Sequence, residues 1–464
     1  MVDFYKTGIV NRNGNLFIGS VSAALLAKKF RTPLYVINEN RIRENYIRLR
    51  NALAKKYKIN KVRIHYAMKA NSNLNILKIL NSEGSYIDAL SLNEVLAALD
   101  AGFAKEKILF TGTNVTDDEL RALSEKKIRM NLDSRSALER LIKIVKSKFI
   151  SARINPEIGA GHHSHTITAG PDSKFGIWEH DALEFYERAK SIGGVKKFGI
   201  HMHIGSGILN VVDFIQPLAR FMDIAGKIAK KTGIKFEFID IGGGLGVPYK
   251  PEDEFDLDKY VNEVLGLFVR KLKEHKLGEP YFCIEPGRFL VADAVVLLTR
   301  VNTLKQTPHK KFAGIDAGFN VLVRPTMYDS YHHIIVDGKP ETKNKKQETY
   351  DVYDVVGPIC ESGDYIARAR TLPKLSEGDL LCVLTTGAYG YSMSSNYNLR
   401  TRAAEILVNN GKYELVRKHD EFEKIISGQR KASWLYRSTK KTWIAYTQPI
   451  EIKPKKQNRK NLVG

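Results

Sequence analysis

The chain has 464 residues, of which 43% are hydrophobic and 27% charged, so it can bury a large core and is not collagen, low-complexity or disordered. At about 150 residues per domain, this length corresponds to roughly two to four domains. The formal net charge is +22, but +9 of it falls in the last 35 residues, so the excess does not mark the whole chain as nucleic-acid-binding.

The segment before residue 39 contains two strand-like runs, LFIGSV and PLYVIN. From about residue 62, strand-like runs alternate with amphipathic helical patterns, and all but the last run are clearly followed by a helix. A closed (β/α)₈ barrel over residues 39–290 is the economical fold for that count, while an open doubly wound sheet is the alternative. The eight strand-like runs are VRIHYAMK, YIDAL, KILFTG, IRMNLD, SARINPE, KFGIHMHIG, FEFIDIGGG and YFCIEPGRF.

After residue 290 the pattern changes to short apolar runs separated by Gly, Pro and charged turns. Examples are AVVLLTRVNTL, YDVYDVVG and DLLCVLTTG. This pattern is typical of a mainly antiparallel β domain, which we place at residues 291–428 and expect residues 1–38 to join.

A basic extension forms the remainder, residues 429–464. Between Arg430 and Gly464, ten Lys or Arg stand against one acid, with Trp434, Tyr436, Trp443 and Tyr446 among them. We expect an extra segment that packs on the β domain or a neighbouring subunit, followed by a frayed basic end. Contacts with RNA or single strands are the less favoured alternative, because no nucleic-acid-binding motif accompanies the charges.

Sequence features also bear on the compartment. The start, MVDFYKTGIV, has no basic segment followed by an apolar core, and no apolar run approaches the ~20 residues of a membrane span. Three irregularly spaced cysteines do not form a disulfide framework. We therefore expect a cytoplasmic protein with no signal peptide and no membrane segment.

The active site of a βα barrel lies at the carboxyl ends of its strands, and residues with suitable chemistry collect there. They are Lys69 after the first strand, His203 and Ser206 after the sixth, Gly243 and Gly244 after the seventh, and Glu285, Gly287 and Arg288 after the eighth. Each alone is a weak signal, since a Lys at a strand end is usually solvated and a Gly run is usually a turn.

As a set, these residues suit pyridoxal phosphate. The cofactor needs a Lys whose amine can attack its aldehyde. Its phosphate needs backbone N–H groups free of side chains, which glycine supplies. Its pyridine nitrogen needs an acidic partner to stay protonated, and an imidazole can stack on the ring.

Six ordered motifs carry a resemblance to a known family: HYAMKANSN, HMHIGSG, DIGGGLGVPY, EPGRFLVAD, CESGD and GAYGYSMSSNYN. Together they resemble the fold-type III pyridoxal-phosphate decarboxylases, over roughly residues 12–425. The resemblance implies a TIM-like barrel plus a β domain, working as a homodimer with active sites at the subunit interface.

The resemblance also implies individual roles. Lys69 matches the lysine that binds the cofactor covalently, and His203 matches the imidazole stacked on its ring. Ser206, Gly243 and Gly244 match phosphate contacts. Glu285 matches the partner of the pyridine nitrogen. Gly287 and Arg288 lie beside it, and Arg288 also meets the substrate.

Further roles concern the substrate. Arg324 and Tyr328, in RPTMY, match contacts to the substrate carboxylate, and Tyr389 matches a contact shared by cofactor and substrate. Cys360 and Glu361 match residues that reach across from the other subunit. There the Cys is the proposed proton donor and the Glu reads the distal end of the substrate.

Substrate choice follows from two of these residues. Arg324 offers a fork for a carboxylate, and Glu361 can pair with an amine. Because buried unpaired charges are costly, the two together favour meso-2,6-diaminopimelate, decarboxylated to L-lysine and CO₂. Ornithine, arginine, lysine or carboxynorspermidine remain as alternative substrates. An alanine racemase is disfavoured by CESGD and EPGR, and a non-catalytic cofactor-binding or regulatory homologue is remote.

The segment GAGHHSHTITAG carries His162, His163 and His165, which could suggest a metal. No paired carboxylate or Cys completes a ligand set, so we predict a loop lining the substrate entrance and no metal site.

Overall fold

The computed structural model describes residues 8–12, 14–161, 163, 166–339, 350–430 and 432. The chain divides into two compact units, residues 1–421 and 422–464. In the second unit the described part contains one short helix, α13 (Phe422–Ile426). The aromatic and most of the basic residues of the predicted extension, Trp434, Tyr436, Trp443 and Tyr446 included, lie outside the described residues. None of the described helices combines the length and apolar character that a membrane span requires.

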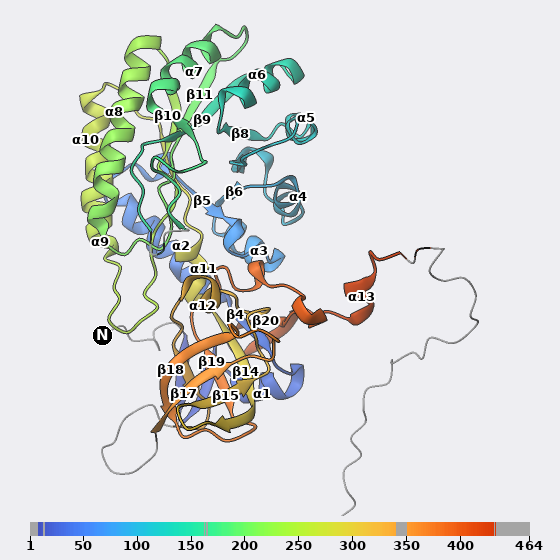
Figure 1. Cartoon of the computed structure of the whole chain (residues 1–464). Helices are drawn as coiled ribbons and strands as arrows, with labels where there is room; N and C mark the ends of the chain where they lie inside the picture. Colours follow the sequence, from blue (N-terminus) through green and yellow to red (C-terminus); the bar gives the residue numbers. More distant parts are fainter. Residues whose placement is uncertain are drawn as a thin grey trace, which may run out of the picture. The chain divides into compact units, whose positions relative to one another are not determined.

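Eight parallel strands close into a barrel, which confirms the barrel and excludes the open sheet (Figure 1). Each strand pairs with its neighbours in chain order, and the pairing of β13 with β5 closes the ring. The short strand β10 (Ile177–Trp178) adds to the edge of β9. The barrel strands are β5 (Val62–Ala67), β6 (Tyr86–Ala89), β7 (Ile108–Phe110), β8 (Arg129–Leu132), β9 (Phe149–Asn155), β11 (Lys197–His201), β12 (Phe236–Asp240) and β13 (Tyr281–Ile284).

Amphipathic helices cover the barrel, each burying one apolar face. Their starts follow the expected chemistry: Ser91 caps α4, Ser134 caps α6, and Thr116 with Glu119 forms a capping box on α5. The covering helices are α3 (Leu74–Ser82), α4 (Leu92–Asp100), α5 (Asp117–Glu125), α6 (Arg135–Ile144), α7 (Glu179–Ser191), α8 (Ile215–Thr232), α9 (Leu257–Tyr260) and α10 (Gly266–Glu274).

From the sequence we predicted no helix or strand between the N-terminal strands and β5, but the structure has a helix there, α2 (Glu39–Ala54). The helix is polar overall, yet it buries Ile42, Tyr46, Leu49 and Leu53 along one face. It packs beside the short helix α11 (Arg288–Val291), where the Asn45 amide donates to the Leu290 carbonyl. Helix α2 thus covers the part of the barrel that follows the eighth strand.

The barrel interior changes character along its axis. A small apolar cluster fills the inside from four strands, with Leu109, Phe238 and Cys283 buried and Phe149 and Tyr281 packed against them. Towards the carboxyl ends of the strands, the buried inward side chains are polar or charged instead: His65, Asp88, Arg153, His201 and Asp240. Since buried charges are costly without partners, this end is the candidate for chemistry.

The second part of the first unit is a β domain with mainly antiparallel pairing, as predicted. The long strand β14 (Val295–Gln306) pairs with β4 (Leu34–Asn38), β15 (Lys311–Ile315) and β19 (Leu380–Val383). Two pairings are parallel, β15 with β17 and β4 with β20. The other strands are β16 (Ile334–Val336), β17 (Tyr350–Val356), β18 (Tyr365–Pro373), β20 (Ala404–Asn409) and β21 (Lys412–Arg417).

The N-terminal segment contributes to the β domain in two ways. Strand β4, from PLYVIN, lies inside the large sheet between β14 and β20. Strands β1 (Ile9–Arg12), β2 (Asn15–Ile18) and β3 (Val21–Ser22) form a separate three-stranded sheet followed by α1 (Ala23–Phe30). Buried residues of β1 to β3 share one hydrophobic cluster with those of β14, β19 and β20.

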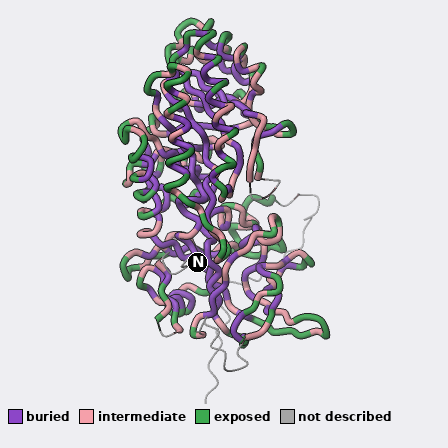
Figure 2. Tube along the Cα trace, turned by 90° about the vertical axis from the view of Figure 1, so that its left-hand side faces the viewer, coloured by how far each residue is buried: buried purple, intermediate pink, exposed green. Residues whose placement is uncertain are grey.

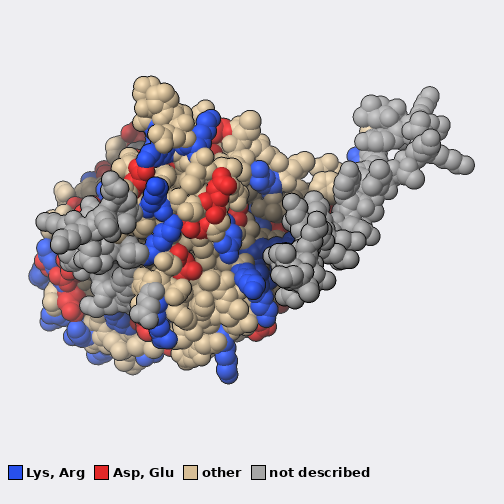
Figure 3. All heavy atoms as spheres, turned by 90° about the horizontal axis from the view of Figure 1, so that it is seen from below, with Lys and Arg blue, Asp and Glu red and all other residues tan. Residues whose placement is uncertain are grey.

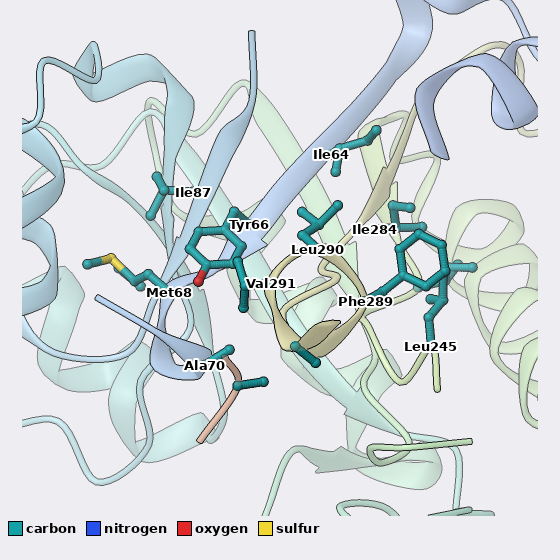
Figure 4. Packing of buried hydrophobic residues seen from close by; sticks show 14 of the residues in the cluster. Ile64, Tyr66, Met68, Ala70, Ile87, Leu245, Ile284, Phe289, Leu290 and Val291 are labelled. Atoms are coloured by element: carbon teal, nitrogen blue, oxygen red, sulfur yellow. The ribbon is translucent and has the colours of Figure 1, made fainter. Parts of the chain in front are cut away.

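One hydrophobic core runs from the barrel into the β domain. It joins barrel residues such as Tyr66 and Ile284 to Tyr35 and Val383 of the β domain. Figure 4 shows residues of this cluster from β5, β13 and α11, including Phe289, and Figure 2 shows the buried trace along the barrel strands. This shared core fixes β-domain segments next to the carboxyl ends of the barrel strands.

The surface carries both signs of charge. On the face shown in Figure 3, Lys and Arg side chains alternate with Asp and Glu rather than forming one continuous basic area. Among the described residues, several exposed basic groups are paired, such as Lys55 with Asp258 and Lys58 with Glu279. Exposed pairs of this kind contribute little to stability.

Candidate active site

A cavity of about 300 Å³ lies where the barrel meets the β domain. Seven of the residues singled out from the sequence line it: Lys69, His203, Ser206, Arg288, Arg324, Tyr328 and Tyr389. Its other lining residues are Leu90, Thr111, Gly112, Thr113, Arg153, Thr166, Thr168 and Phe175. The cavity therefore brings together side chains from both parts of the first unit.

Lys69 sits in a 3₁₀ turn, Met68–Ala70, directly after β5. Its Nζ lies 3.3 Å from Asp88 Oδ2 on β6, a carboxylate that is 1% exposed. Burial alone would lower the pKa of Lys69, but Asp88, Tyr389 and Glu285 together raise it above its ordinary value. Lys69 is thus held as a cation beside Asp88 until an incoming group changes its surroundings.

His203 follows β11 and is fixed by the glycine turn after β12. The Gly243 N–H donates to His203 Nδ1 at 3.0 Å, so a neutral imidazole carries its proton on Nε2. Burial, Lys69 and Arg153 lower the pKa of His203 well below its ordinary value, which keeps the ring neutral. A Cβ on Gly243 would lie 2.2 Å from the Glu285 carbonyl oxygen, so only glycine allows these two chain segments to meet.

Arg288 is buried at the start of α11. Its guanidinium donates to the Tyr249 hydroxyl at 2.8 Å and to Ser206 Oγ at 3.1 Å, while Nε has no partner among the described residues. No carboxylate of the described residues lies within ion-pairing distance of it. A buried guanidinium without an acid, next to Ser206 and the glycine turns, is suited to bind an anion.

Arg324, on the short helix α12 (Arg324–Tyr328), is 1% exposed. It donates to His332 Nε2 at 2.9 Å and to Ser330 Oγ at 3.2 Å, and it lies over the Tyr249 ring at 4.4 Å. Burial lowers the pKa of Arg324 to about 10. None of the described carboxylates pairs with it, so it is a second buried cation facing the cavity without an acid.

His332 fixes the orientation of that guanidinium. Its Nδ1 lies 2.9 Å from the Leu384 carbonyl oxygen, which can only accept, so Nδ1 carries the proton. The lone pair on Nε2 is then free to accept from Arg324. Burial and the Arg324 charge lower the pKa of His332 well below its ordinary value, in keeping with a neutral ring.

Glu285 directly follows β13 and is 3% exposed. Its Oε2 lies 3.0 Å from His201 Nε2, while Oε1 is buried and has no hydrogen-bond partner among the described residues. Burial would raise the pKa of Glu285, but the hydrogen bond from His201 and the charge of Lys69 lower it to about 2. The carboxylate is therefore ionised, with one oxygen left for a further donor.

These features fit pyridoxal phosphate. The unpartnered Oε1 of Glu285 suits a protonated pyridine nitrogen. The unpaired Arg288 guanidinium and Ser206, beside Gly243 and Gly244, suit a phosphate. Lys69 and His203 line the same cavity, so the amine and the imidazole are within reach of one bound ring. Gly287 allows close packing, since a Cβ there would lie 3.0 Å from the Ala67 carbonyl oxygen.

Cys360 and Glu361 lie outside this cavity. Both are exposed, in the segment after β17, and Glu361 lines a separate shallow hollow with Ser362 and Tyr365. The Cys360 N–H donates to Asn398 Oδ1 at 2.8 Å, which ties this segment to the loop Ser394–Arg400. Within one chain, these two predicted site residues do not meet the seven that line the cavity.

The histidine-containing loop reaches the cavity mouth. His163 packs edge-on against Tyr328 at 5.6 Å between ring centres, and Thr166 and Thr168 line the cavity. His162 and His165 lie outside the described residues. The described part of the loop thus borders the cavity, at the place where we predicted an entrance loop.

Five residues of the site did not emerge from the sequence: Asp88, Arg153, His201, Tyr249 and His332. A signal existed for two of them. An acid inside the apolar strand YIDAL is a buried polar residue, and His201 is a second histidine at the end of the same strand-like run, two positions before His203. Tyr249 and His332 are recognised only by their contacts with the two arginines.

A barrel with a lysine after its first strand, an anion site and a buried carboxylate defines a class, that of pyridoxal-phosphate enzymes of the TIM-barrel type. Residues 39–292 match the family model described as the pyridoxal binding domain of the pyridoxal-dependent decarboxylases. The predicted class of enzyme and its cofactor are confirmed by this match.

Similar proteins narrow the class. The chain is 50% identical to the diaminopimelate decarboxylase of Methanothermobacter thermautotrophicus over 422 residues, 90% of this chain and 96% of that protein. It is 37% identical to the Aquifex aeolicus diaminopimelate decarboxylase over 91% of this chain and 97% of that protein. The chain belongs to the diaminopimelate decarboxylase family, as its motifs indicated.

Solved structures of diaminopimelate decarboxylases resemble this chain along most of its length. The diaminopimelate decarboxylase of M. jannaschii in complex with L-lysine superposes with a TM-score of 0.84 at 32% identity, covering 92% of this chain and 98% of that one. The Helicobacter pylori enzyme, also complexed with L-lysine, gives a TM-score of 0.79 at 32% identity, covering 87% and 98%.

Proposed function

We propose that this protein decarboxylates meso-2,6-diaminopimelate to L-lysine and CO₂, the last step of lysine synthesis from that precursor, in the cytoplasm. The observation that carries the proposal is Arg324: a guanidinium 1% exposed, without an acidic partner among the described residues, in the same cavity as Lys69. Two relatives of the family are complexed with L-lysine, the product of this reaction.

Each of the cofactor-binding residues has a separate role. Lys69 anchors the cofactor through its amine, and Glu285 accepts a hydrogen bond from the ring nitrogen. The neutral His203 stacks on the ring, held by the Gly243 N–H. Ser206, Gly243, Gly244 and Arg288 bind the phosphate, with Gly287 allowing α11 to approach. Bound pyridoxal phosphate supplies an electron sink for the pair left behind when CO₂ departs.

The remaining residues act on the substrate. Arg324 pairs with the distal carboxylate, and Tyr328 and Tyr389 border the same space, with Arg288 beside Tyr389. Glu361 pairs with the distal ammonium. Cys360 donates a proton to the carbon that lost CO₂.

A homodimer completes this assignment. Cys360 and Glu361 are exposed and outside the cavity, so a second copy must supply them if they act there. Two exposed apolar residues are chain neighbours of residues that bond to this segment: Leu399 is 59% exposed and Met327 49%. Asn398 bonds to Cys360, and Thr326 bonds to the Gly363 carbonyl, which places both apolar residues next to the CESGD segment. Such a patch supports burial against a partner.

Two alternatives follow from the same cavity. A decarboxylase of ornithine, lysine, arginine or carboxynorspermidine would use the same cofactor residues but leave the Arg324 charge without a carboxylate. A non-catalytic homologue would have no need of Lys69 beside Asp88. The buried, unpaired Arg324 favours the diaminopimelate reaction over both.

A substrate panel tests the proposal. Purified protein loaded with pyridoxal phosphate is given meso-diaminopimelate, L-ornithine, L-lysine, L-arginine or carboxynorspermidine, and both CO₂ and the amine product are measured. We expect release from diaminopimelate alone, with L-lysine formed. Release from another member of the panel, with none from diaminopimelate, would refute the substrate assignment and leave the fold and cofactor in place.

A further inference from the structure

His201, the first residue of HMHIGSG, has no role assigned from the sequence, yet it lies against the Glu285 carboxylate. It is the last residue of β11 and is fully buried, two positions before His203. Its Nε2 lies 3.0 Å from Glu285 Oε2. The backbone of Glu285 is fixed independently, since its N–H donates to the Gly242 carbonyl at 2.8 Å.

The geometry points to His201 as a positioning residue that donates its Nε2 proton to Glu285 Oε2, keeping this carboxylate ionised and leaving Oε1 for the ring nitrogen of pyridoxal phosphate. This inference rests on the proposed function, because it takes Glu285 as the partner of that nitrogen.

The proton on His201 can be assigned from its contacts. A carboxylate oxygen only accepts, so Nε2 must carry a hydrogen. Nδ1 has no partner among the described residues and is buried. A neutral ring leaves only a lone pair there, whereas an imidazolium would bury an unpaired N–H, which is costly. His201 therefore acts as a neutral donor with a fixed tautomer.

The surroundings show why Glu285 needs this donor. Two other carboxyl groups lie inside the same end of the barrel, Asp88 on β6 and Asp240 on β12. Burial and the Glu285 charge raise the pKa of Asp88 to about 6 and that of Asp240 well above its ordinary value. Asp240 accepts a backbone N–H from Gly242 at 2.9 Å, and its Oδ2 has no hydrogen-bond partner among the described residues. Of these three carboxyl groups, Glu285, which has the imidazole donor, is the one whose pKa is lowered rather than raised.

The hydrogen bond from His201 also determines which oxygen of Glu285 stays available. Glu285 has two oxygens, and with Oε2 engaged by His201 the buried Oε1 is the one without a partner. Charged and titratable groups that face the pair come from every neighbouring strand or turn: His65, Lys69, Asp88, Arg153, His203, Asp240 and Cys283. Among the described residues, none of these seven side chains hydrogen-bonds to the carboxylate, whereas His201 does, at 3.0 Å.

Two substitutions of His201 distinguish its hydrogen bond to Glu285 from the packing of its side chain. In His201→Gln, the side-chain amide nitrogen takes the place of Nε2 and can still donate to Glu285. In His201→Asn, the shorter side chain places its amide near Nδ1 instead and withdraws the donor. His65→Gln is the matched control. This buried histidine on β5 faces Asp240, with its Nδ1 3.7 Å from Oδ2, and it makes no hydrogen bond to Glu285.

The readout is the ring nitrogen itself. Each holoenzyme is loaded with pyridoxal phosphate labelled with ¹⁵N in the ring, and the nitrogen chemical shift reports whether it is protonated. We expect a protonated nitrogen in the wild type, in His201→Gln and in His65→Gln, and a shift towards neutral pyridine in His201→Asn. Dialysis should show cofactor binding weakened about tenfold to a hundredfold in His201→Asn only, since a hydrogen bond to a charged group is lost.

Several results would overturn the inference: a protonated nitrogen and unchanged affinity in His201→Asn, equal loss in the Asn and Gln variants, or a shift in His65→Gln as large as in His201→Asn. A fourth variant, Glu285→Gln, keeps this separate from the proposed function. If Glu285→Gln retains the wild-type nitrogen signal, the assignment of Glu285 fails. If it loses the signal while His201→Asn retains it, only the role of His201 fails.

Discussion

Two parts of the expected active site lie in very different surroundings. The cavity at the carboxyl end of the barrel is built within one chain, and its charged side chains are buried and held by named contacts, such as Arg324 by His332 and Arg288 by Tyr249. Cys360 and Glu361 are exposed, lie outside the cavity, and are held through the backbone. The residues proposed to bind the cofactor therefore come from one chain, whereas those proposed to protonate the product and to read the distal end need an additional surface.

The difference shows where buried charge is informative. In the cavity, an arginine without an acid implies an anionic ligand, because burying an unpaired cation is costly. At the exposed segment no such cost exists, and the charge of Glu361 says nothing about a ligand until a second copy covers it. Predictions that separate the two regions follow, from the largest expected effect to the smallest.

The largest effect is expected at Lys69. Lys69→Ala removes the amine that anchors the cofactor, so decarboxylation should fall below detection. Borohydride reduction of the wild-type holoenzyme followed by mass spectrometry should find the pyridoxyl group on Lys69, and the variant should have none. Lys78→Ala, which removes an exposed lysine from α3, is the control and should keep both. A pyridoxyl group retained on the barrel of Lys69→Ala would show that another residue is the anchor.

A smaller effect is expected at Arg324. Truncating one member of a buried charge pair costs about 2–5 kcal/mol, so Arg324→Gln should lower kcat/KM for diaminopimelate by a factor between about 30 and about 5,000. KM should carry much of the change, and the bound cofactor should be unaffected. Arg188→Gln removes the same charge from the exposed face of α7 and should leave kcat/KM unchanged. Equal kinetics for the two variants would remove Arg324 from the substrate site.

The smallest effect concerns stability against pH. Burial lowers the pKa of His65 from its ordinary 6.5 to about 3. The unfolded chain therefore binds this proton first, and the free energy of unfolding should fall as the pH drops below 6.5. Between pH 6.5 and 5 the loss from this group is about 1.5 kcal/mol. Urea unfolding of the wild type at both pH values, compared with His65→Gln, should show a weaker dependence in the variant. His180→Gln, at an exposed position, should behave like the wild type.

The fold could be read from the sequence to a large extent. The eight strand-like runs correspond to β5 to β9 and β11 to β13, because parallel strands buried on both faces give apolar runs that alternate with amphipathic helices. Helix α2 was missed although Ile42, Tyr46, Leu49 and Leu53 have helical spacing, since its polar residues dominate the segment. The parallel pairings of β15 with β17 and β4 with β20 join distant segments, and no local pattern encodes them.

The active site likewise contains residues that the sequence predicts and residues that only the structure reveals. Residues at strand ends could be located because a βα barrel places its chemistry there. Tyr249 and His332 could not, because their roles come from contacts with Arg288 and Arg324 that only the folded chain brings about. The tautomer of His201 likewise depends on Glu285, 84 positions away.

The most direct test of a site shared between two copies is complementation. Lys69→Ala and Cys360→Ala proteins, each inactive or strongly impaired, are unfolded together, refolded as a mixture with pyridoxal phosphate, and assayed with diaminopimelate. Random pairing makes about half of the dimers mixed, each with one intact site, so about a quarter of the wild-type activity should return. Activity no higher than the average of the two separate variants would contradict the account, because each site would then be completed within a single chain.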